Sequence, residues 1–339
     1  MALLLGVETS CDESSAAVVR DGREILSQIV LSQDIHGVYG GVVPELASRE
    51  HIRTIGPVIR SALREAGAEA RDLEGVAVTV GPGLIGSLVV GLSAARAFAW
   101  SLRIPLLPVH HLEAHLYALR LAHPDRPFEF VGLIVSGGHT EIVDVRGEGE
   151  YELLGATRDD AAGEAFDKVA KMTDLPYPGG PSIDRLARAG ERDRFSFPRA
   201  KLERGSLDFG FSGVKTAVRY ALRDDPSLMD DKNLPDLLAG FQEAVVGPLV
   251  ENTGKALERT GARAVGLCGG VAANSRLREA FAEMAGRRGA ELLLAPVTLC
   301  TDNAAMVAAA GEAALRRGRI APPDQGASAD IPLPFRRRS

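Results

Sequence analysis

Residues 3–20 read LLLGVETSCDESSAAVVR, and this stretch decides the fold. A continuous apolar run over 3–7 predicts a strand, small polar residues follow over 8–15, and an apolar run over 16–20 predicts a second strand. The same unit recurs about 130 residues later in FVGLIVSGGHTEIVDV, residues 130–145. A strand–loop–strand unit that appears twice predicts a duplicated, two-lobed α/β fold.

The rest of the chain supports this fold class. The apolar pattern from Pro44 to Ala66 predicts a long helix, and a third glycine-rich turn, at Gly269 and Gly270, follows the apolar run 264–267. Tight turns of small residues let backbone N–H groups approach phosphate oxygens. Three such turns fit a nucleotide held between lobes, and their spacing resembles the actin, sugar kinase and Hsp70 ATPase superfamily, whose lobes are ribonuclease H-like.

The domain limits follow from the same pattern. We expect an N-terminal lobe at residues 1–110, with a C-terminal helix at about 302–320 that packs back on it. The second lobe is expected at 111–301, with a helical insertion at about 160–235. The end of the chain, 321–339, is rich in Pro and Arg and is expected to be a loose tail.

The composition is that of an ordinary globular protein, because 45% of the 339 residues are hydrophobic and 25% are charged. A net charge of −6 excludes a wholly basic nucleic-acid coat, so an RNA partner would need a local basic patch. Three cysteines, Cys11, Cys268 and Cys300, do not make a disulfide framework and favour a reducing compartment. The apolar stretch 84–102 is interrupted by Arg96 and predicts a buried helix rather than a membrane span. Together these features predict a cytoplasmic protein.

Two motifs imitate known nucleotide sites. Residues 81–86, GPGLIG, match the dinucleotide fingerprint after a strand, but the next strand runs into His110 where an acidic residue is expected. The sequence Asp208-Phe209-Gly210 imitates a protein-kinase motif, but no catalytic-loop motif lies upstream of it. We interpret both matches as coincidental.

His111 and His115 are the sharpest candidates for a metal site. Residues four apart share a helix face, so both imidazoles can reach one ion, and a pair of packing or surface histidines is the alternative. The zinc-protease pattern is excluded because Leu112 stands where that pattern has Glu. A metal at two histidines needs a third ligand, for which Asp302 is the best candidate by context. The alternative is that Thr301 or Asp302 caps the helix that follows.

Seven longer motifs occur in order along the chain, and together they resemble one family. They are GVETSCDE (6–13), GGVVPELASR (40–49), HHLEAH (110–115), VSGGHT (135–140), DDAAGEAFDK (159–168), YPGGP (177–181) and CTDN (300–303). From residue 3 to about 317 the chain is similar to the bacterial tRNA N6-adenosine threonylcarbamoyltransferase family, once labelled an O-sialoglycoprotein endopeptidase.

The resemblance implies a set of site residues. One divalent metal per subunit, usually taken as Fe²⁺ with Zn or Mg possible as isolated, is expected at His111, His115 and Asp302. The threonylcarbamoyl-adenylate is expected to lie against Ile134, Val135, Ser136, Gly137, Gly138, Asp167, Gly180, Asp184 and Asn274. For Asp184 a solvated helix position is the alternative.

The reaction that the resemblance implies is transfer of threonylcarbamoyl from threonylcarbamoyl-AMP to N6 of adenosine 37 in tRNAs that read ANN codons, with release of AMP. The carbonyl of the mixed anhydride is already activated, so the protein mainly positions substrates and stabilises negative charge. Asp12 or Glu13 could assist proton transfer from N6, or could only shape the first loop.

The resemblance also implies partners. They are tRNA, a small non-catalytic paralogue that forms a heterodimer with the chain, and a small ATPase; no membrane is expected. Candidate RNA contacts are Arg194, Arg199, Lys201, Arg204 and Arg336–Arg338, although runs of Arg are also typical of a solvated face. A kinase or ATPase of the same fold, a metalloprotease and a nucleotide-switched scaffold are the competing functions, of which the first leaves the two histidines unexplained.

Overall fold

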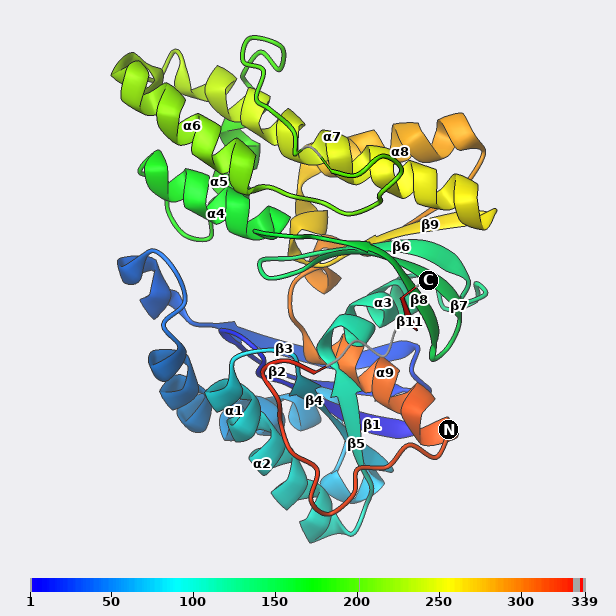
Figure 1. Ribbon diagram of the computed structural model, residues 1–339. Helices are drawn as coiled ribbons and strands as arrows, with labels where there is room; N and C mark the ends of the chain where they lie inside the picture. Colours follow the sequence, from blue (N-terminus) through cyan, green and yellow to red (C-terminus); the bar gives the residue numbers. More distant parts are fainter. Residues whose placement is uncertain (1, 201, 332–335, 338–339) are drawn as a thin grey trace. The chain divides into compact units, whose positions relative to one another are not determined.

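The computed structural model describes residues 2–200, 202–331 and 336–337, which form two compact units (Figure 1). Unit 1 contains the described residues up to Pro127 and those from Ala295 to Ile331, so it is built from two separate segments of the chain. Unit 2 contains the segment Phe128–Leu294 and the short strand β11 (Arg336–Arg337).

The sheet of unit 1 contains the predicted first strands. Its strands are β1 (Leu3–Glu8), β2 (Glu13–Arg20), β3 (Glu24–Ser32), β4 (Gly75–Gly81) and β5 (Leu106–His110), in the order β3-β2-β1-β4-β5. β1 pairs antiparallel with β2 and parallel with β4, and β2 pairs antiparallel with β3. Asp21 and Gly22 both have positive φ, 52° and 63°, as the tight turn of the predicted hairpin requires.

Helices cover both faces of this sheet, and alternation along β1 explains which covers which. Leu5 and Val7 join the core that β1 shares with α1 (Pro44–Ala66) and α2 (Ile85–Leu102). Gly6 points to the other face, where α9 (Ala304–Arg316) contacts β1, β2 and β4 and packs on α3 (His111–Ala122). The continuous apolar run of β1 is therefore typical of a strand buried on both faces.

Unit 2 repeats the topology of unit 1, which confirms the duplication. Its sheet has the order β10-β9-β6-β7-β8-β11, in which β6 pairs antiparallel with β7 and parallel with β9 as β1 does with β2 and β4. The strands are β6 (Phe130–Val135), β7 (Thr140–Gly147), β8 (Glu150–Ala156), β9 (Ala264–Cys268) and β10 (Glu291–Leu294). The α-helices are α4 (Ala162–Met172), α5 (Gly179–Ala187), α6 (Ser212–Asp224), α7 (Leu234–Thr260) and α8 (Ser275–Arg288). Five 3₁₀ helices complete the described elements: η1 (Asp34–Tyr39), η2 (Ala70–Asp72), η3 (Pro226–Met229), η4 (Gly270–Ala273) and η5 (Val297–Leu299).

Two of the expected limits differ from the observed ones. The chain passes into unit 2 after Pro127 rather than after His110, because α3 packs on α9 in unit 1. Residues 321–331 run along unit 1: the Ala321 amide donates to Leu106 O at 2.8 Å and the Ser328 amide to Val80 O at 3.0 Å. This part of the expected loose tail packs on unit 1, and residues 332–335 and 338–339 of that tail lie outside the described residues.

Packing explains the three glycines of the segment 81–86, which matches the dinucleotide fingerprint. A Cβ at Gly83 would lie 2.6 Å from Ser10 O, one at Gly86 2.3 Å from Ser48 Oγ, and one at Gly81 2.2 Å from Ser328 O. The protein's own atoms therefore occupy the space that the fingerprint keeps open for a pyrophosphate.

One helix in the described part of the chain, α2, is long and apolar enough to cross a membrane, which by itself is weak evidence. Its inner face, which includes Leu88, Leu92 and Ala95, is buried in unit 1. Only 33% of α2 is buried, so the helix that the sequence predicts to be buried is buried on this inner face alone.

Gly6 should tolerate no larger side chain. In Gly6→Ala the new Cβ would lie 2.1 Å from Ala304 O, so β1 and α9 must separate, and we expect the free energy of unfolding to fall by roughly 1–3 kcal/mol or more. Urea unfolding followed by circular dichroism measures this. Gly56→Ala is the control, because its Cβ would meet only Arg60 Nη1 at 3.6 Å inside α1, where alanine gains about 0.5–1 kcal/mol. A Gly6→Ala midpoint equal to that of Gly56→Ala would contradict the close packing.

Candidate metal centre

Two histidines and one aspartate converge within unit 1. His115 Nε2 lies 3.3 Å from Asp302 Oδ1, and His111 Nε2 lies 3.6 Å from the same oxygen. The three ligand atoms lie within 4.8 Å of one another, with both histidines buried. The structure thus brings together the three residues that the sequence singled out.

Local structure explains how the three side chains are presented. β5 ends at His110, whose Nδ1 accepts the Leu112 amide at 3.2 Å and so caps the first turn of α3. The next residues then place His111 and His115 one turn apart, with ring centroids 4.8 Å apart. Asp302 directly precedes the cap of α9.

The cap of α9 decides one alternative. It is Asn303, whose Oδ1 accepts the Met306 amide at 3.0 Å, so neither Thr301 nor Asp302 has that role. Asp302 is instead aimed at the two imidazoles.

The chemistry of this group fits a divalent metal ion. His115 is 0% exposed, and neither of its ring nitrogens has a hydrogen-bond partner among the described residues. A buried polar atom without a partner costs about 1–3 kcal/mol, which a coordinated cation would offset. Two imidazoles and one carboxylate with open positions are a donor set used by iron(II) and zinc.

The charges around His111 also favour a bound cation. Burial would lower the pKa of His111, but the carboxylates of Asp302 and Glu8 raise it to about 9. Burial would raise the pKa of Glu8, but the hydrogen bond and charge of His111 outweigh burial and hold that pKa below its ordinary value. The carboxylates around His111 therefore favour a positive charge in this part of unit 1.

The loop after β1 adds further acidic groups. Burial, together with the carboxylates of Asp302 and Asp12, raises the pKa of Glu13 well above its ordinary value. Burial and the same carboxylates raise the pKa of the Cys11 thiol, so Cys11 is not an activated nucleophile. Asp12 and Glu13 thus belong to the environment of Asp302, whereas their role in proton transfer stays a prediction.

The expected adenylate residues lie in unit 2: residues 134–138 at the end of β6, the others in α4, in α5 and at the cap of α8. The Ser136 loop packs on the start of α4, where a Cβ at Gly163 would lie 2.6 Å from Ser136 O. It also lies close to η4, since a Cβ at Gly269 would lie 2.4 Å from Val135 O. In contrast, a Cβ at Gly137 or Gly138 would meet nothing within 4 Å, so the protein's own packing does not explain these two glycines.

Hydrogen bonds hold the two aspartates of the candidate adenylate site beside other candidate residues. Asp167 Oδ1 accepts the Gly179 amide at 2.8 Å, next to Gly180, whose Cβ position is also open. Asp184 Oδ1 accepts the Ser275 hydroxyl at 2.7 Å, and Ser275 follows Asn274. Asp184 is buried, so the alternative of a solvated helix position is wrong for it.

Sequence reasoning missed two buried polar residues that contact the candidates. Gln242 Oε1 accepts from Asn274 Nδ2 at 2.8 Å, and Glu8 Oε2 lies 3.4 Å from His111 Nδ1. Glu8 had a readable signal, because it is a charged residue in line with the buried apolar run of β1. Gln242 gave none, because it lies within a long helix.

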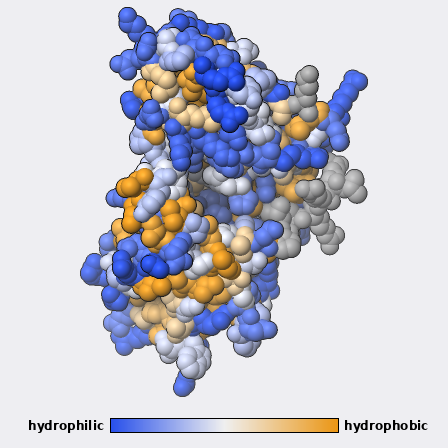
Figure 2. Space-filling view, turned by 60° about the vertical axis from the view of Figure 1, so that its left-hand side comes forward, coloured by the Kyte–Doolittle hydropathy of each residue, from blue (hydrophilic) through white to orange (hydrophobic). Residues whose placement is uncertain are grey.

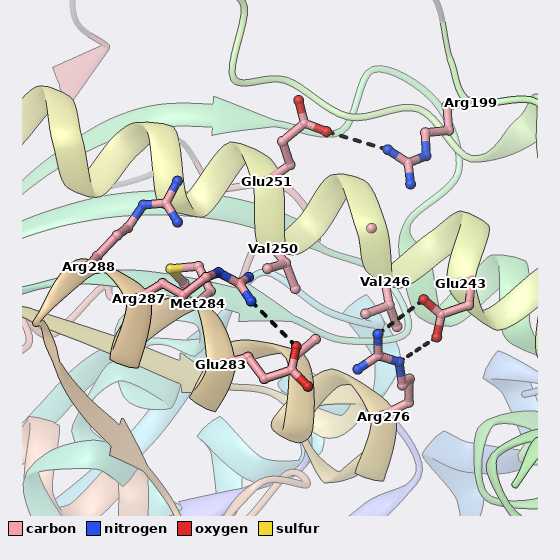
Figure 3. Close-up of a pocket in the computed structure, with 12 residues that line it drawn as sticks. Arg199, Glu243, Val246, Val250, Glu251, Arg276, Glu283, Met284, Arg287 and Arg288 are labelled. Atoms are coloured by element: carbon pink, nitrogen blue, oxygen red, sulfur yellow. Dashed lines mark hydrogen bonds and ion pairs between the residues drawn. The ribbon is translucent and has the colours of Figure 1, made fainter. Parts of the chain in front are cut away.

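A surface groove of about 310 Å³ lies between α7 and α8 in unit 2 (Figure 3). Its arginines face glutamates: Arg276 pairs with Glu243, and Arg199 Nη1 lies 3.4 Å from Glu251. Since the charges are matched, the groove offers no unpaired cluster of cations for a phosphate.

Two of the arginines that are expected to contact RNA are also paired with carboxylates. Arg194 pairs with Asp236, and Arg199 pairs with Glu251, so an RNA phosphate would have to compete with each carboxylate. Lys201 and Arg338 lie outside the described residues.

The family model and the sequence relatives name the same family. Residues 24–309 match the family model for tRNA N6-adenosine threonylcarbamoyltransferase. The chain is 53% identical over 318 residues to the protein of that name from Syntrophus aciditrophicus, covering 94% of each chain. It is 54% identical to that of Symbiobacterium thermophilum, covering 93% of this chain and 92% of the relative.

Solved structures of lower similarity show the fold alone. A HypF from T. kodakarensis has a TM-score of 0.63 at 13% identity, covering 93% of this chain and 48% of its own. A ROK hexokinase from Thermus thermophilus has a TM-score of 0.51 at 17% identity, covering 94% and 99%. The chain has the two-lobed α/β fold of the actin, sugar kinase and Hsp70 ATPase class, as the sequence predicts.

Substitution of His115 by leucine should separate metal binding from stability. In the metal-free chain, His115→Leu removes two buried nitrogens without partners, so the unfolding midpoint should stay equal or rise. With a divalent metal at 100 times its Kd, the unsubstituted chain should gain about 2.7 kcal/mol and the variant none. Thermal unfolding with and without chelator measures both.

His51→Leu is the matched control. His51 is buried in the same unit, but its nitrogens are paired with Ser14 Oγ at 2.7 Å and Cys11 O at 2.9 Å. It should lose stability and keep the full metal-dependent rise. An equal rise in His115→Leu and in the unsubstituted chain would contradict the site.

Proposed function

The chain belongs to the tRNA N6-adenosine threonylcarbamoyltransferase family, and from this we propose roles for its residues. The enzyme transfers a threonylcarbamoyl group to N6 of an adenosine in tRNA. We assign the metal to His111, His115 and Asp302, and the threonylcarbamoyl-adenylate to residues 134–138 with Asp167, Gly180, Asp184 and Asn274. The observation that carries the metal assignment is His115, a buried imidazole whose two nitrogens make no hydrogen bond among the described residues, with Nε2 3.3 Å from Asp302 Oδ1.

Iron(II) is the metal that we propose. Two histidines and one carboxylate, with further positions open, are the donor set of many non-haem iron(II) centres. Mg²⁺ prefers oxygen ligands and near-octahedral geometry, so a site with two nitrogens argues against it. When bound, the ion would supply Lewis acidity toward carbonyl or phosphate oxygens.

The chain's own groups then position and activate the substrates. Attack by N6 on the carbamoyl carbonyl forms a C–N bond, breaks the C–O bond to phosphate, and expels AMP, while N6 loses a proton. The Ser136 amide already donates to His139 O at 2.8 Å, so we assign charge stabilisation to the amides of Gly137 and Gly138. Asp12 or Glu13 would take the N6 proton.

The adenylate assignment explains glycines that packing does not. Gly137, Gly138 and Gly180 have open space where a Cβ would stand, so a bound ligand is the reason we propose for their small size. Asp167 and Asp184 offer carboxylate oxygens to ribose hydroxyls. The match to the transferase family gives no support to a metabolite kinase of the same fold.

Reconstitution of the reaction tests this function. The chain would be combined with the synthase that makes the adenylate, its partners, labelled threonine and unmodified tRNA, and nucleosides would be analysed by mass spectrometry. Threonylcarbamoyladenosine should depend on the chain, and Gly180→Val should lower its rate about 100-fold by displacing the adenylate. Gly213→Val is the control, because Gly213 also stands second in its helix with open space around its Cβ position. Equal rates for the two variants would refute the adenylate assignment.

We propose further that a small non-catalytic paralogue binds unit 1, that a small ATPase joins them, and that the complex works in the cytoplasm. The support is an exposed apolar surface on α1 and α2: Ile52 is 68% exposed, Val89 48% and Trp100 83%. Hydrophobic residues gather on one face of unit 1 in Figure 2. Monomeric proteins rarely leave such apolar side chains together in water.

Ile52→Glu should abolish this heterodimer, because it places a charge at the centre of an apolar contact. Size-exclusion chromatography of the chain mixed with the purified paralogue measures complex formation. Ile320→Glu is the control, since Ile320 is 54% exposed but lies beyond α9, outside the α1 and α2 surface. Retention of the complex by Ile52→Glu would exclude this surface.

A further inference from the structure

Glu8 stands at the end of β1 and is 0% exposed. A carboxylate in this position is expensive, because β1 is buried on both faces and the surrounding strands are apolar. None of the hydrogen bonds or ion pairs of Glu8 in the described chain comes from Lys or Arg. Pairing with a basic side chain is therefore not the reason for an acid at this position.

The contacts of Glu8 point toward the metal ligands. Its Oε1 accepts the Ser10 amide at 2.5 Å, and its Oε2 accepts the Thr79 hydroxyl at 2.5 Å. The same Oε2 lies 3.4 Å from Nδ1 of His111, whose other nitrogen faces Asp302 at 3.6 Å. Two donors thus fix the carboxylate, and it meets the ring nitrogen of His111 that faces away from Asp302.

We propose that Glu8 is a positioning residue, which holds the proton of His111 on Nδ1 and so presents the lone pair of Nε2 to the metal ion. A carboxylate accepts hydrogen bonds and cannot donate them, so it selects the tautomer in which Nδ1 carries hydrogen. Ser10 Oγ lies 3.2 Å from the same nitrogen, but a hydroxyl both donates and accepts and selects neither tautomer. This inference rests on the metal role proposed above for His111.

Because both carboxylate oxygens of Glu8 have defined partners, the orientation of the amide in Glu8→Gln can be predicted. Oε1 must accept the Ser10 amide, so the glutamine oxygen takes that place and its NH₂ takes the place of Oε2. The NH₂ then faces His111 Nδ1 as a donor. His111 is driven to the tautomer with hydrogen on Nε2, which cannot bind a metal ion through that atom. The substitution keeps the size of the side chain, removes its negative charge and replaces an acceptor by a donor at the atom that faces His111.

The experiment measures metal binding by the purified full chain, with Co²⁺ as the probe. Competition with a chromophoric chelator gives the Kd, and the visible ligand-field bands report the ligands. Glu8→Gln should raise the Kd about 10–100-fold and shift the bands. Thermal unfolding of the metal-free proteins records stability separately.

Glu113→Gln is the matched control. Glu113 is also a buried glutamate, it lies on α3 between the two histidines, and its Oε1 lies 3.6 Å from Arg317. It should lose stability and keep the Kd and the bands of the unsubstituted chain. Should Glu8→Gln fail to fold, Thr79→Val removes one donor to Oε2, and a smaller increase in Kd is expected.

Failure of the metal site and failure of the role proposed for Glu8 would give different results. If His115→Leu and the unsubstituted chain bind Co²⁺ equally, the metal site itself is wrong. If His115→Leu loses binding while Glu8→Gln keeps the original Kd and bands, the metal site stands and the role of Glu8 is overturned. Equal weakening in Glu8→Gln and Glu113→Gln would also overturn it, since the effect would then be one of stability alone.

Discussion

The close approach of β1 to α9 is the constraint on which the metal centre depends. The two elements come so near at Gly6 that a methyl group there would stand 2.1 Å from Ala304 O. Glu8 lies two residues beyond Gly6 on the strand, and Asp302 lies two residues before Ala304 on the other side of the contact. The Ala304 amide also donates to Ser15 Oγ at 2.9 Å, which ties the same point to β2. One strand-to-helix contact therefore sets the distance between the ligand Asp302 and the carboxylate that faces His111.

The centre opposes stability in the metal-free chain. His115 keeps two buried nitrogens without partners among the described residues, and acidic groups gather around Asp302 with His111 as their nearest cation. Apolar residues at these positions would give a more stable unit 1. An arrangement that costs folding free energy and offers a cation three donors is typical of a functional site. The rest of the sheet, with its continuous apolar strands, supplies the stability that the site removes.

The sequence predicts the limits of elements that are determined locally, but not the features that depend on contacts between residues far apart in the chain. The long helix Pro44–Ala66 and the strand Phe130–Val135 have the predicted limits, because apolar periodicity and a first-turn proline determine them locally. The helix beginning at His111 was placed in the wrong lobe, since its partner α9 lies almost 200 residues downstream. The capping role of Asn303 and the contact of Glu8 with His111 likewise needed coordinates, because no sequence spacing relates residues on different elements.

Unit 1 is assembled from two separate segments of the chain, and this has a consequence for synthesis on the ribosome. The segment Phe128–Leu294, which makes all of unit 2 except the edge strand β11, emerges before α9 is made and can begin to fold first. The two histidines are synthesised before this segment, whereas the proposed third ligand, Asp302, is synthesised after it. The nascent chain therefore exposes the face of β1 around Gly6 until the last helix covers it. The three proposed ligands are therefore present together only once synthesis has reached the start of α9.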